Sequence, residues 1–199
     1  LKDIHCSYER TEALSIPSLS MPSGKITAII GTNGAGKSTF VSYMCGLMKK
    51  NKGTFLLDGK KQTAKERVQK SYLVMQEVNH QLFSDSVREE IVLGNRDSSE
   101  NSLQKIMETL DISVLTERHP MTLSGGQKQR VIIASAMFCG KKILYFDEPT
   151  SGLDFSHMMQ TCQLLNQLHG EDVFVFIITH DYELIASVCD SVCLLYTSP

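Results

Sequence analysis

The sequence predicts an α/β domain built around a largely parallel β-sheet. Short apolar runs alternate with segments of helical periodicity along the 199 residues, as in domains that alternate strands and helices. Two of these runs, residues 143–146 and 173–179, are apolar almost throughout, as expected for strands covered on both faces. Two glycine-rich turns, at residues 31–38 and 123–127, are each placed to open a helix.

The first part of the chain contains further strand candidates. Residues 1–20 are expected to form shorter strands around turns, and residues 26–30 a buried strand directly before the first glycine-rich turn. Residues 53–58 and 71–75 are two more candidates, separated by the Asp58-Gly59 turn signal. Strand-like segments therefore extend to about residue 75 before the pattern changes.

Between about residues 79 and 121 the pattern is helical. Ser86 and Glu89 form a capping box ahead of an apolar segment. An amphipathic helix is then predicted by apolar residues at i, i+3, i+4 and i+7, namely Leu103, Ile106, Met107 and Leu110. We interpret these side chains as ordinary core.

The first glycine-rich turn has the sequence of a phosphate-binding loop. It reads Gly-Thr-Asn-Gly-Ala-Gly-Lys-Ser and matches G-x-x-x-x-G-K-[ST] at each fixed position. In such a loop the backbone N–H groups and the helix N-terminus face phosphate oxygens, Lys37 reaches the β- and γ-phosphates, and the Ser38 hydroxyl binds Mg²⁺. The sequence therefore predicts a site for ATP and Mg²⁺ formed by Gly31, Thr32, Asn33, Gly34, Ala35, Gly36, Lys37, Ser38 and Thr39.

An acidic pair follows the apolar run at residues 143–146. Asp147 and Glu148 should emerge at the carboxyl end of a buried strand, the end that faces the ligand crevice in open α/β sheets. Asp147 is placed to help hold Mg²⁺, which leaves Glu148 free to orient and deprotonate the attacking water. A solvent-facing acidic pair is the alternative, but the strand before it and Pro149-Thr150 after it favour the catalytic interpretation.

The second glycine-rich turn reads Leu-Ser-Gly-Gly-Gln and precedes an apolar helix. It forms a second anion site without a lysine or a carboxylate pair. This turn resembles the signature sequence of ABC ATPases, and the other motifs of that family occur in order around it, from the first residues to about His180. The resemblance implies the P-loop NTPase fold, with an antiparallel β edge subdomain and an inserted α-helical subdomain that carries the signature.

The same resemblance implies roles for residues that carry little information alone. Tyr8 corresponds to the aromatic residue on which adenine stacks, and Gln76 to the Q-loop glutamine that senses Mg²⁺ and signals to a transmembrane partner. His180 corresponds to the switch histidine at the γ-phosphate, and residues 151–154 to the D-loop. In a head-to-tail pair of domains, the nucleotide of one domain would be covered in trans by Ser124, Gly125, Gly126 and Gln127 of the other.

The resemblance also sets the expected domain organisation. We expect residues 1–199 to be a single ABC ATPase domain, within which residues 79–140 approximate the helical subdomain. The chain starts at Leu1 and stops about twenty residues after His180, so we expect a fragment with an incomplete C-terminus.

Composition excludes several classes of function. The 20 Lys and Arg against 22 Asp and Glu give a net charge of −2, so no dominant field for nucleic acid is present. The six cysteines contain no C-x-x-C pair, which is typical of a reducing compartment and offers no zinc framework. No apolar run approaches the roughly 20 residues of a membrane span. Any membrane association must therefore come through a partner, and the resemblance to ABC ATPases implies peripheral attachment, through a transmembrane transporter subunit, to the cytoplasmic face of the cell membrane.

The segment after Gln76 indicates a particular branch of the ABC family. Residues 75–83 read Met-Gln-Glu-Val-Asn-His-Gln-Leu-Phe and resemble the energy-coupling-factor branch, which drives uptake of vitamins or transition-metal ions in prokaryotes. Phe155 stands where proline is commoner after the D-loop, and Thr32 replaces the usual proline or serine of the phosphate loop. Neither substitution changes a ligating group.

The predicted function is an ATP-hydrolysing subunit that powers a membrane ABC transporter of this branch. A soluble ABC ATPase acting on ribosomes or DNA is the main alternative. Only about fifty residues separate Gln76 from the signature, without the heptad array of chromosome-maintenance types. A regulatory domain without turnover is a third possibility, disfavoured by the intact Lys37, Asp147, Glu148 and His180.

Overall fold

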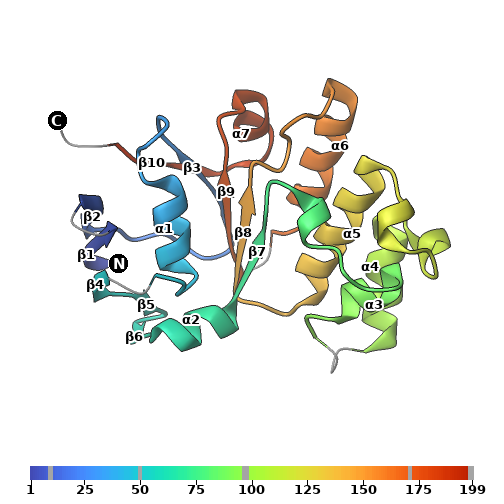
Figure 1. Cartoon of the computed structure of the whole chain (residues 1–199), viewed down its shortest axis with the longest axis horizontal. Helices are drawn as coiled ribbons and strands as arrows, with labels where there is room; N and C mark the ends of the chain where they lie inside the picture. Colours follow the sequence, from blue (N-terminus) through green and yellow to red (C-terminus); the bar gives the residue numbers. More distant parts are fainter. Residues whose placement is uncertain (9–10, 49–50, 96–98, 170–171, 197–199) are drawn as a thin grey trace.

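The central element is a five-stranded sheet with strand order β10-β3-β9-β8-β7 (Figure 1). The computed structural model describes residues 1–8, 11–48, 51–95, 99–169 and 172–196, without the side chains of residues 8, 11 and 12. All four neighbouring strand pairs of the sheet are parallel, which confirms the predicted sheet type. Its strands are β3 (Ile26–Ile30), β7 (Ser71–Val74), β8 (Ile143–Asp147), β9 (Phe174–Ile178) and β10 (Ser191–Leu194).

Alternation along the strands produces two hydrophobic cores, one on each face of the sheet. In β8, Leu144 and Phe146 belong to one core, whereas Ile143 and Tyr145 belong to the other. Helices cover the first face, and the core there includes side chains of α3 (Val87–Val92), α4 (Glu100–Thr109), α5 (Gly125–Phe138), α6 (Phe155–Asn166) and α7 (Tyr182–Val188).

The second core lies beneath helix α1 (Lys37–Met44) and a small antiparallel sheet of order β2-β1-β4. Its strands are β1 (Lys2–Tyr8), β2 (Thr11–Ser18) and β4 (Asn51–Thr54), which confirms the expected antiparallel edge. The Asp58-Gly59 turn closes a short hairpin of β5 (Leu56–Leu57) and β6 (Lys60–Lys61), which the sequence analysis did not anticipate. Helix α2 (Ala64–Lys70) then leads into β7.

Between β7 and β8 the regular structure of the described residues consists of helices and 3₁₀ turns joined by turns and irregular chain. Besides α3, α4 and α5 it contains three 3₁₀ turns, η1 (Val78–His80), η2 (Ser113–Leu115) and η3 (Pro120–Thr122). The predicted stripe is confirmed in part, because Leu103, Met107 and Leu110 are buried in the core and Ile106 is only partly buried. These helices lie at the opposite end of the molecule from the antiparallel sheet (Figure 1). Among the described residues no helix is long and apolar enough to cross a membrane.

A polar clamp joins the start of β3 to α6 and β10. The Asp190 carboxylate accepts hydrogen bonds from the Ile26 N–H at 2.8 Å and from Nε2 of His169 at 3.1 Å. The Asn166 carbonyl, and then Asp190, raise the pKa of His169. The Ile26 N–H, and then His169, lower the pKa of Asp190. The clamp therefore holds the start of the strand that leads into the phosphate loop.

The clamp makes stability depend on pH. A raised folded-state pKa of His169 means that its contribution is complete below about pH 6.5 and is lost as pH rises through the folded value. The unfolding midpoint of the parent should exceed that of His169→Asn by up to about 3 °C at pH 5.5, and by less at pH 8.5. Differential scanning calorimetry at both pH values measures this. Asp190→Asn keeps an acceptor for Ile26 and should weaken the pH dependence; an unchanged profile would contradict the clamp.

Candidate nucleotide site

The phosphate loop connects the carboxyl end of β3 to the first turn of α1 (Figure 1). Gly36 caps α1 in the left-handed conformation with a φ of +87°, and a Cβ there would lie 2.7 Å from the Ala13 carbonyl oxygen. Gly34 has a φ of +85° with no atom within 4 Å of the corresponding position. The loop therefore needs glycine at both places, and at Gly34 it leaves open space beside the backbone.

Lys37 lies across this loop rather than extending away from it. Its ammonium group donates hydrogen bonds to the carbonyl oxygens of Gly31 at 2.7 Å and of Thr32 at 3.1 Å. Ser38 is exposed in the first turn of α1, whereas Thr39 and Ala35 are buried. The Lys37 ammonium therefore lies against the loop backbone, and Ser38 next to it is exposed.

Asp147 and Glu148 stand at the carboxyl end of β8, as the sequence predicted. Burial raises the pKa of Asp147, the neighbouring Glu148 carboxylate raises it further, and the positive charge of Lys37 opposes both. Glu148 has a positive φ of 48°, and its N–H donates to the Ile178 carbonyl at 2.8 Å. This strained conformation is fixed by the end of β9 and turns the Glu148 side chain towards the residues that follow that strand.

Two residues after β9 hold the Glu148 carboxylate. Nδ1 of His180 lies 2.8 Å from Oε1, and the Thr179 hydroxyl donates to Oε2 at 3.3 Å. The Glu148 side chain is 15 % exposed, whereas that of His180 is 83 % exposed. The structure therefore brings together Glu148 and His180, which are 32 residues apart in the chain.

Sequence reasoning missed the residues that support this pair. The Thr179 hydroxyl accepts a hydrogen bond from the Asp181 N–H at 3.1 Å, and the Asp181 carboxylate accepts one from the Thr150 hydroxyl at 2.9 Å. Asp181 also caps α7. In the sequence, Thr179 and Asp181 stand on either side of His180 at the end of an apolar run. This pattern indicates a role for them only when the tertiary contacts are known.

The donor set available for a divalent cation is small and consists of oxygens. The predicted ligands are the Ser38 hydroxyl, the Asp147 carboxylate and the side-chain carbonyl of Gln76, and no group of three or more His, Cys, Asp or Glu side chains suited to a metal occurs within the described ranges. Mg²⁺ prefers oxygen ligands and is usually held by one or two protein groups together with substrate phosphates and water. The residues present fit that ion.

Gln76 is exposed just after β7. Its side-chain amide donates to the Ser151 hydroxyl at 3.2 Å, which links the Q-loop to the D-loop. Tyr8 ends β1, but its side chain lies outside the described part of the structure, so the predicted stacking on adenine stays a prediction.

The signature turn opens α5 through a complete capping box. The Gln127 N–H donates to the Ser124 hydroxyl at 3.4 Å, and the Ser124 N–H donates to Oε1 of Gln127 at 3.0 Å. Gly125 is exposed, and a Cβ there would meet no atom within 4 Å. Within the described residues no hydrogen bond joins this turn to the phosphate loop of the same chain.

Fold and site together define a P-loop nucleotide-binding domain, with a phosphate loop after β3 and an acidic pair after β8. The family model "ABC transporter" matches residues 14–151, which is more than half of the chain. The chain therefore belongs to the ATP-binding domains of the ABC transporter family and binds ATP.

Individual relatives agree with this assignment. An ABC transporter ATP-binding protein of Treponema denticola is 43% identical over 98% of this chain, which spans 40% of that protein's length. The energy-coupling factor transporter ATP-binding protein EcfA of Methanothermobacter thermautotrophicus is 34% identical over 98% of this chain and 67% of its own. The solved structure of cbiO1 from Clostridium perfringens, described as part of the ABC transporter complex cbiONQ, has a TM-score of 0.86 at 29% identity and covers 98% and 82% of the two chains.

The two loop glycines provide a matched test of the loop geometry. Both have a positive φ, so Gly34→Ala should destabilise the fold by about 1 kcal/mol. Gly36→Ala should cost about 1–3 kcal/mol more, because its methyl group would also collide with the Ala13 carbonyl. Urea unfolding without nucleotide measures both; equal losses would show that the contact with Ala13 does not constrain the loop.

Proposed function

We propose that this chain hydrolyses ATP with Mg²⁺ and powers a membrane transporter of the energy-coupling-factor type that imports vitamins or metal ions. The observation that carries the catalytic part is the Glu148 carboxylate held by His180 and Thr179 beside Asp147. Family membership supports hydrolysis, and the names of the relatives support transport.

Each residue of the proposed site has a task that follows from its position. Lys37 binds the β- and γ-phosphates in the loop from Gly31, and Ser38 and Asp147 hold the Mg²⁺, which neutralises phosphate charge when bound. The Glu148 carboxylate accepts a proton from the attacking water. His180 orients that carboxylate through Nδ1, and its exposed side chain leaves Nε2 available to the γ-phosphate.

The signature turn is assigned to a second domain's nucleotide. Ser124, Gly125 and Gly126 open a 14-residue helix, whose N-terminus favours phosphate, and Gly125 leaves the approach open. Because this turn makes no hydrogen bond to the phosphate loop of its own chain among the described residues, we propose the head-to-tail pairing of two ABC domains with ATP between them.

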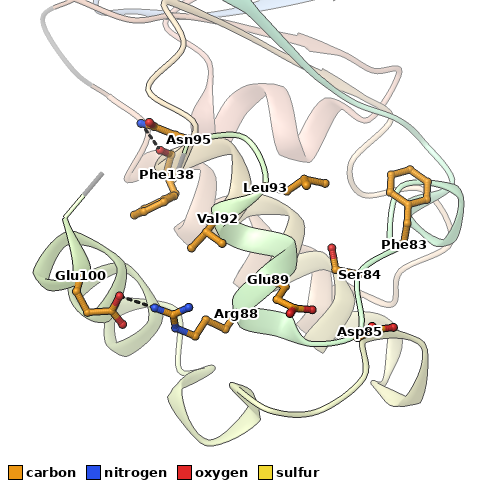
Figure 2. Close-up of a pocket in the computed structure, with 10 residues that line it drawn as sticks. All are labelled: Phe83, Ser84, Asp85, Arg88, Glu89, Val92, Leu93, Asn95, Glu100 and Phe138. Carbon is orange, nitrogen blue, oxygen red and sulfur yellow. Dashed lines mark hydrogen bonds and ion pairs between the residues drawn. The ribbon is translucent and has the colours of Figure 1, made fainter. Parts of the chain in front are cut away.

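The proposed site for the transmembrane partner is a pocket of about 490 Å³ beside α3 (Figure 2). Phe83, which follows the Q-loop, lines it and is 71% exposed. Arg88 and Glu100, which both line it, form an ion pair of 2.6 Å, and Leu93, which is 50% exposed, adds apolar surface. An exposed aromatic side chain beside apolar and charged groups suits a helix that carries both kinds of side chain. Attachment there would place the chain peripherally at the cytoplasmic face of the membrane.

Glu148→Gln tests the catalytic proposal. The amide cannot accept the proton of water, so turnover should fall by 10²–10⁴-fold, about 3–5 kcal/mol of barrier, while ATP binding persists. Phosphate release and calorimetric titration with ATP and Mg²⁺ measure the two effects. Lys37→Ala should instead lose ATP affinity. Near-parental turnover in Glu148→Gln would remove this residue from the role of base, and a parent without turnover would favour the regulatory alternative.

Phe83→Ala tests the transmembrane partner. Loss of an exposed aromatic anchor should reduce the share of the complete protein found in washed membranes by about half or more, with basal ATP hydrolysis retained. Val114→Ala is the control, because Val114 is 88% exposed on η2 and does not line the pocket. Equal membrane retention in both variants would contradict docking at Phe83, and co-purification with ribosomes or DNA instead would favour the soluble alternative.

A further inference from the structure

The start of α6 lies beside the start of the signature helix α5. The two helices pack side by side on the same face of the sheet (Figure 1). Asp154, the last residue of the D-loop, is the N-cap of α6, and His157 stands in its first turn. The imidazole of His157 has no role in the site described above.

Asp154 holds this imidazole in one orientation. The Asp154 carboxylate accepts the His157 N–H at 3.0 Å through Oδ1 and bonds to Nδ1 of the ring at 2.7 Å through Oδ2. The His157 N–H and then the ring lower the pKa of Asp154, so the carboxylate is charged at neutral pH. Both hydrogen bonds lie within one helical turn, and the ring is therefore aimed by the D-loop.

The opposite edge of the ring covers a signature glycine. A Cβ built on Gly126 would lie 3.3 Å from Cδ2 of His157 and 3.9 Å from Nε2. The first distance is shorter than an ordinary van der Waals contact of a Cβ atom. At Gly125 the same construction meets nothing within 4 Å. One signature glycine thus packs against the D-loop helix of its own chain, and the other has open space beside it.

One more contact joins the signature helix to the chain after Glu148, and a second joins that chain to the Q-loop. The Gln129 side chain of α5 donates to the Pro149 carbonyl, directly after Glu148, and the Ser151 hydroxyl accepts from Gln76. The chain between Glu148 and α6 is therefore held against α5 at its beginning and, through His157, at its end. A displacement at Glu148 in one nucleotide site would reach the signature turn, which serves the other site.

We propose that His157 is a positioning residue that fixes the signature turn, through Gly126, relative to the D-loop. This inference rests on the proposed ATP hydrolysis by paired domains. The ring matters because a planar side chain with two torsion angles, one end held by Asp154, sets a definite spacing between two helix ends. Misplacement of a phosphate-binding turn by about 1 Å can cost up to 10²-fold in rate, whereas the phosphate loop of the same chain is unaffected.

Three substitutions separate the two contacts of the ring. His157→Asn keeps a donor near the position of Nδ1 for Asp154 and removes the edge over Gly126, at similar helix propensity. His157→Phe keeps the edge and removes the donor, and His157→Ala removes both. In the complete protein we expect kcat to fall about tenfold in the Asn and Ala variants, with ATP affinity within about twofold of the parent, and His157→Phe to recover most of the loss.

Gln163→Ala is the matched control, because Gln163 is exposed on the same helix and lies outside the site. Steady-state phosphate release, ATP titration and thermal unfolding are measured for each variant, and midpoints should stay within about 2 °C of the parent. A parental kcat in His157→Asn would overturn the inference, as would a fall in kcat matched by losses of ATP affinity and midpoint. If the parent itself does not hydrolyse ATP, the proposed function fails first, and that outcome is recognised before any variant is compared.

Discussion

Parallel pairing of β3, β9 and β8 is the constraint on which the rest of the structure depends. Because neighbouring strands run in the same direction, their carboxyl ends reach one edge of the sheet, and each is followed by a polar segment. The phosphate loop follows β3, the acidic pair follows β8, and Thr179 and His180 follow β9. Three segments that are distant in the chain thereby reach one edge of the sheet, and hydrogen bonds of Glu148 with Ile178, Thr179 and His180 join two of them.

Strain and burial at this edge are localised where the proposed chemistry needs them. Glu148 adopts a positive φ because its N–H bonds to Ile178 while its carboxylate bonds to His180 and Thr179. Burial raises the pKa of Asp147, so the carboxylate gains from a nearby cation, and Lys37 already supplies part of that charge. The apolar layers on both faces of β8 hold these groups in place against their mutual repulsion.

The helical segment between β7 and β8 adds a second level of organisation. Among the described residues its signature turn makes no hydrogen bond to the phosphate loop of its own chain, yet its helix contacts the chain that follows Glu148. Hydrogen bonds from Gln129 and Gln76 reach Pro149 and Ser151. The segment that would serve a partner's nucleotide is thus attached to the residues that would cleave its own, which suits a protein whose two sites work together.

The sequence by itself determined the parallel sheet, the phosphate loop from Gly31, the acidic pair and the helix opened by Ser124, because each depends on local pattern and residue type. It did not reveal the Thr179–Asp181–Thr150 hydrogen bonds, the β5–β6 hairpin or the contact of His157 with Gly126. Only the tertiary structure decided these features. Hydrogen bonds and packing between segments depend on which strand ends and helix ends become neighbours, and a local sequence pattern does not predict those neighbours.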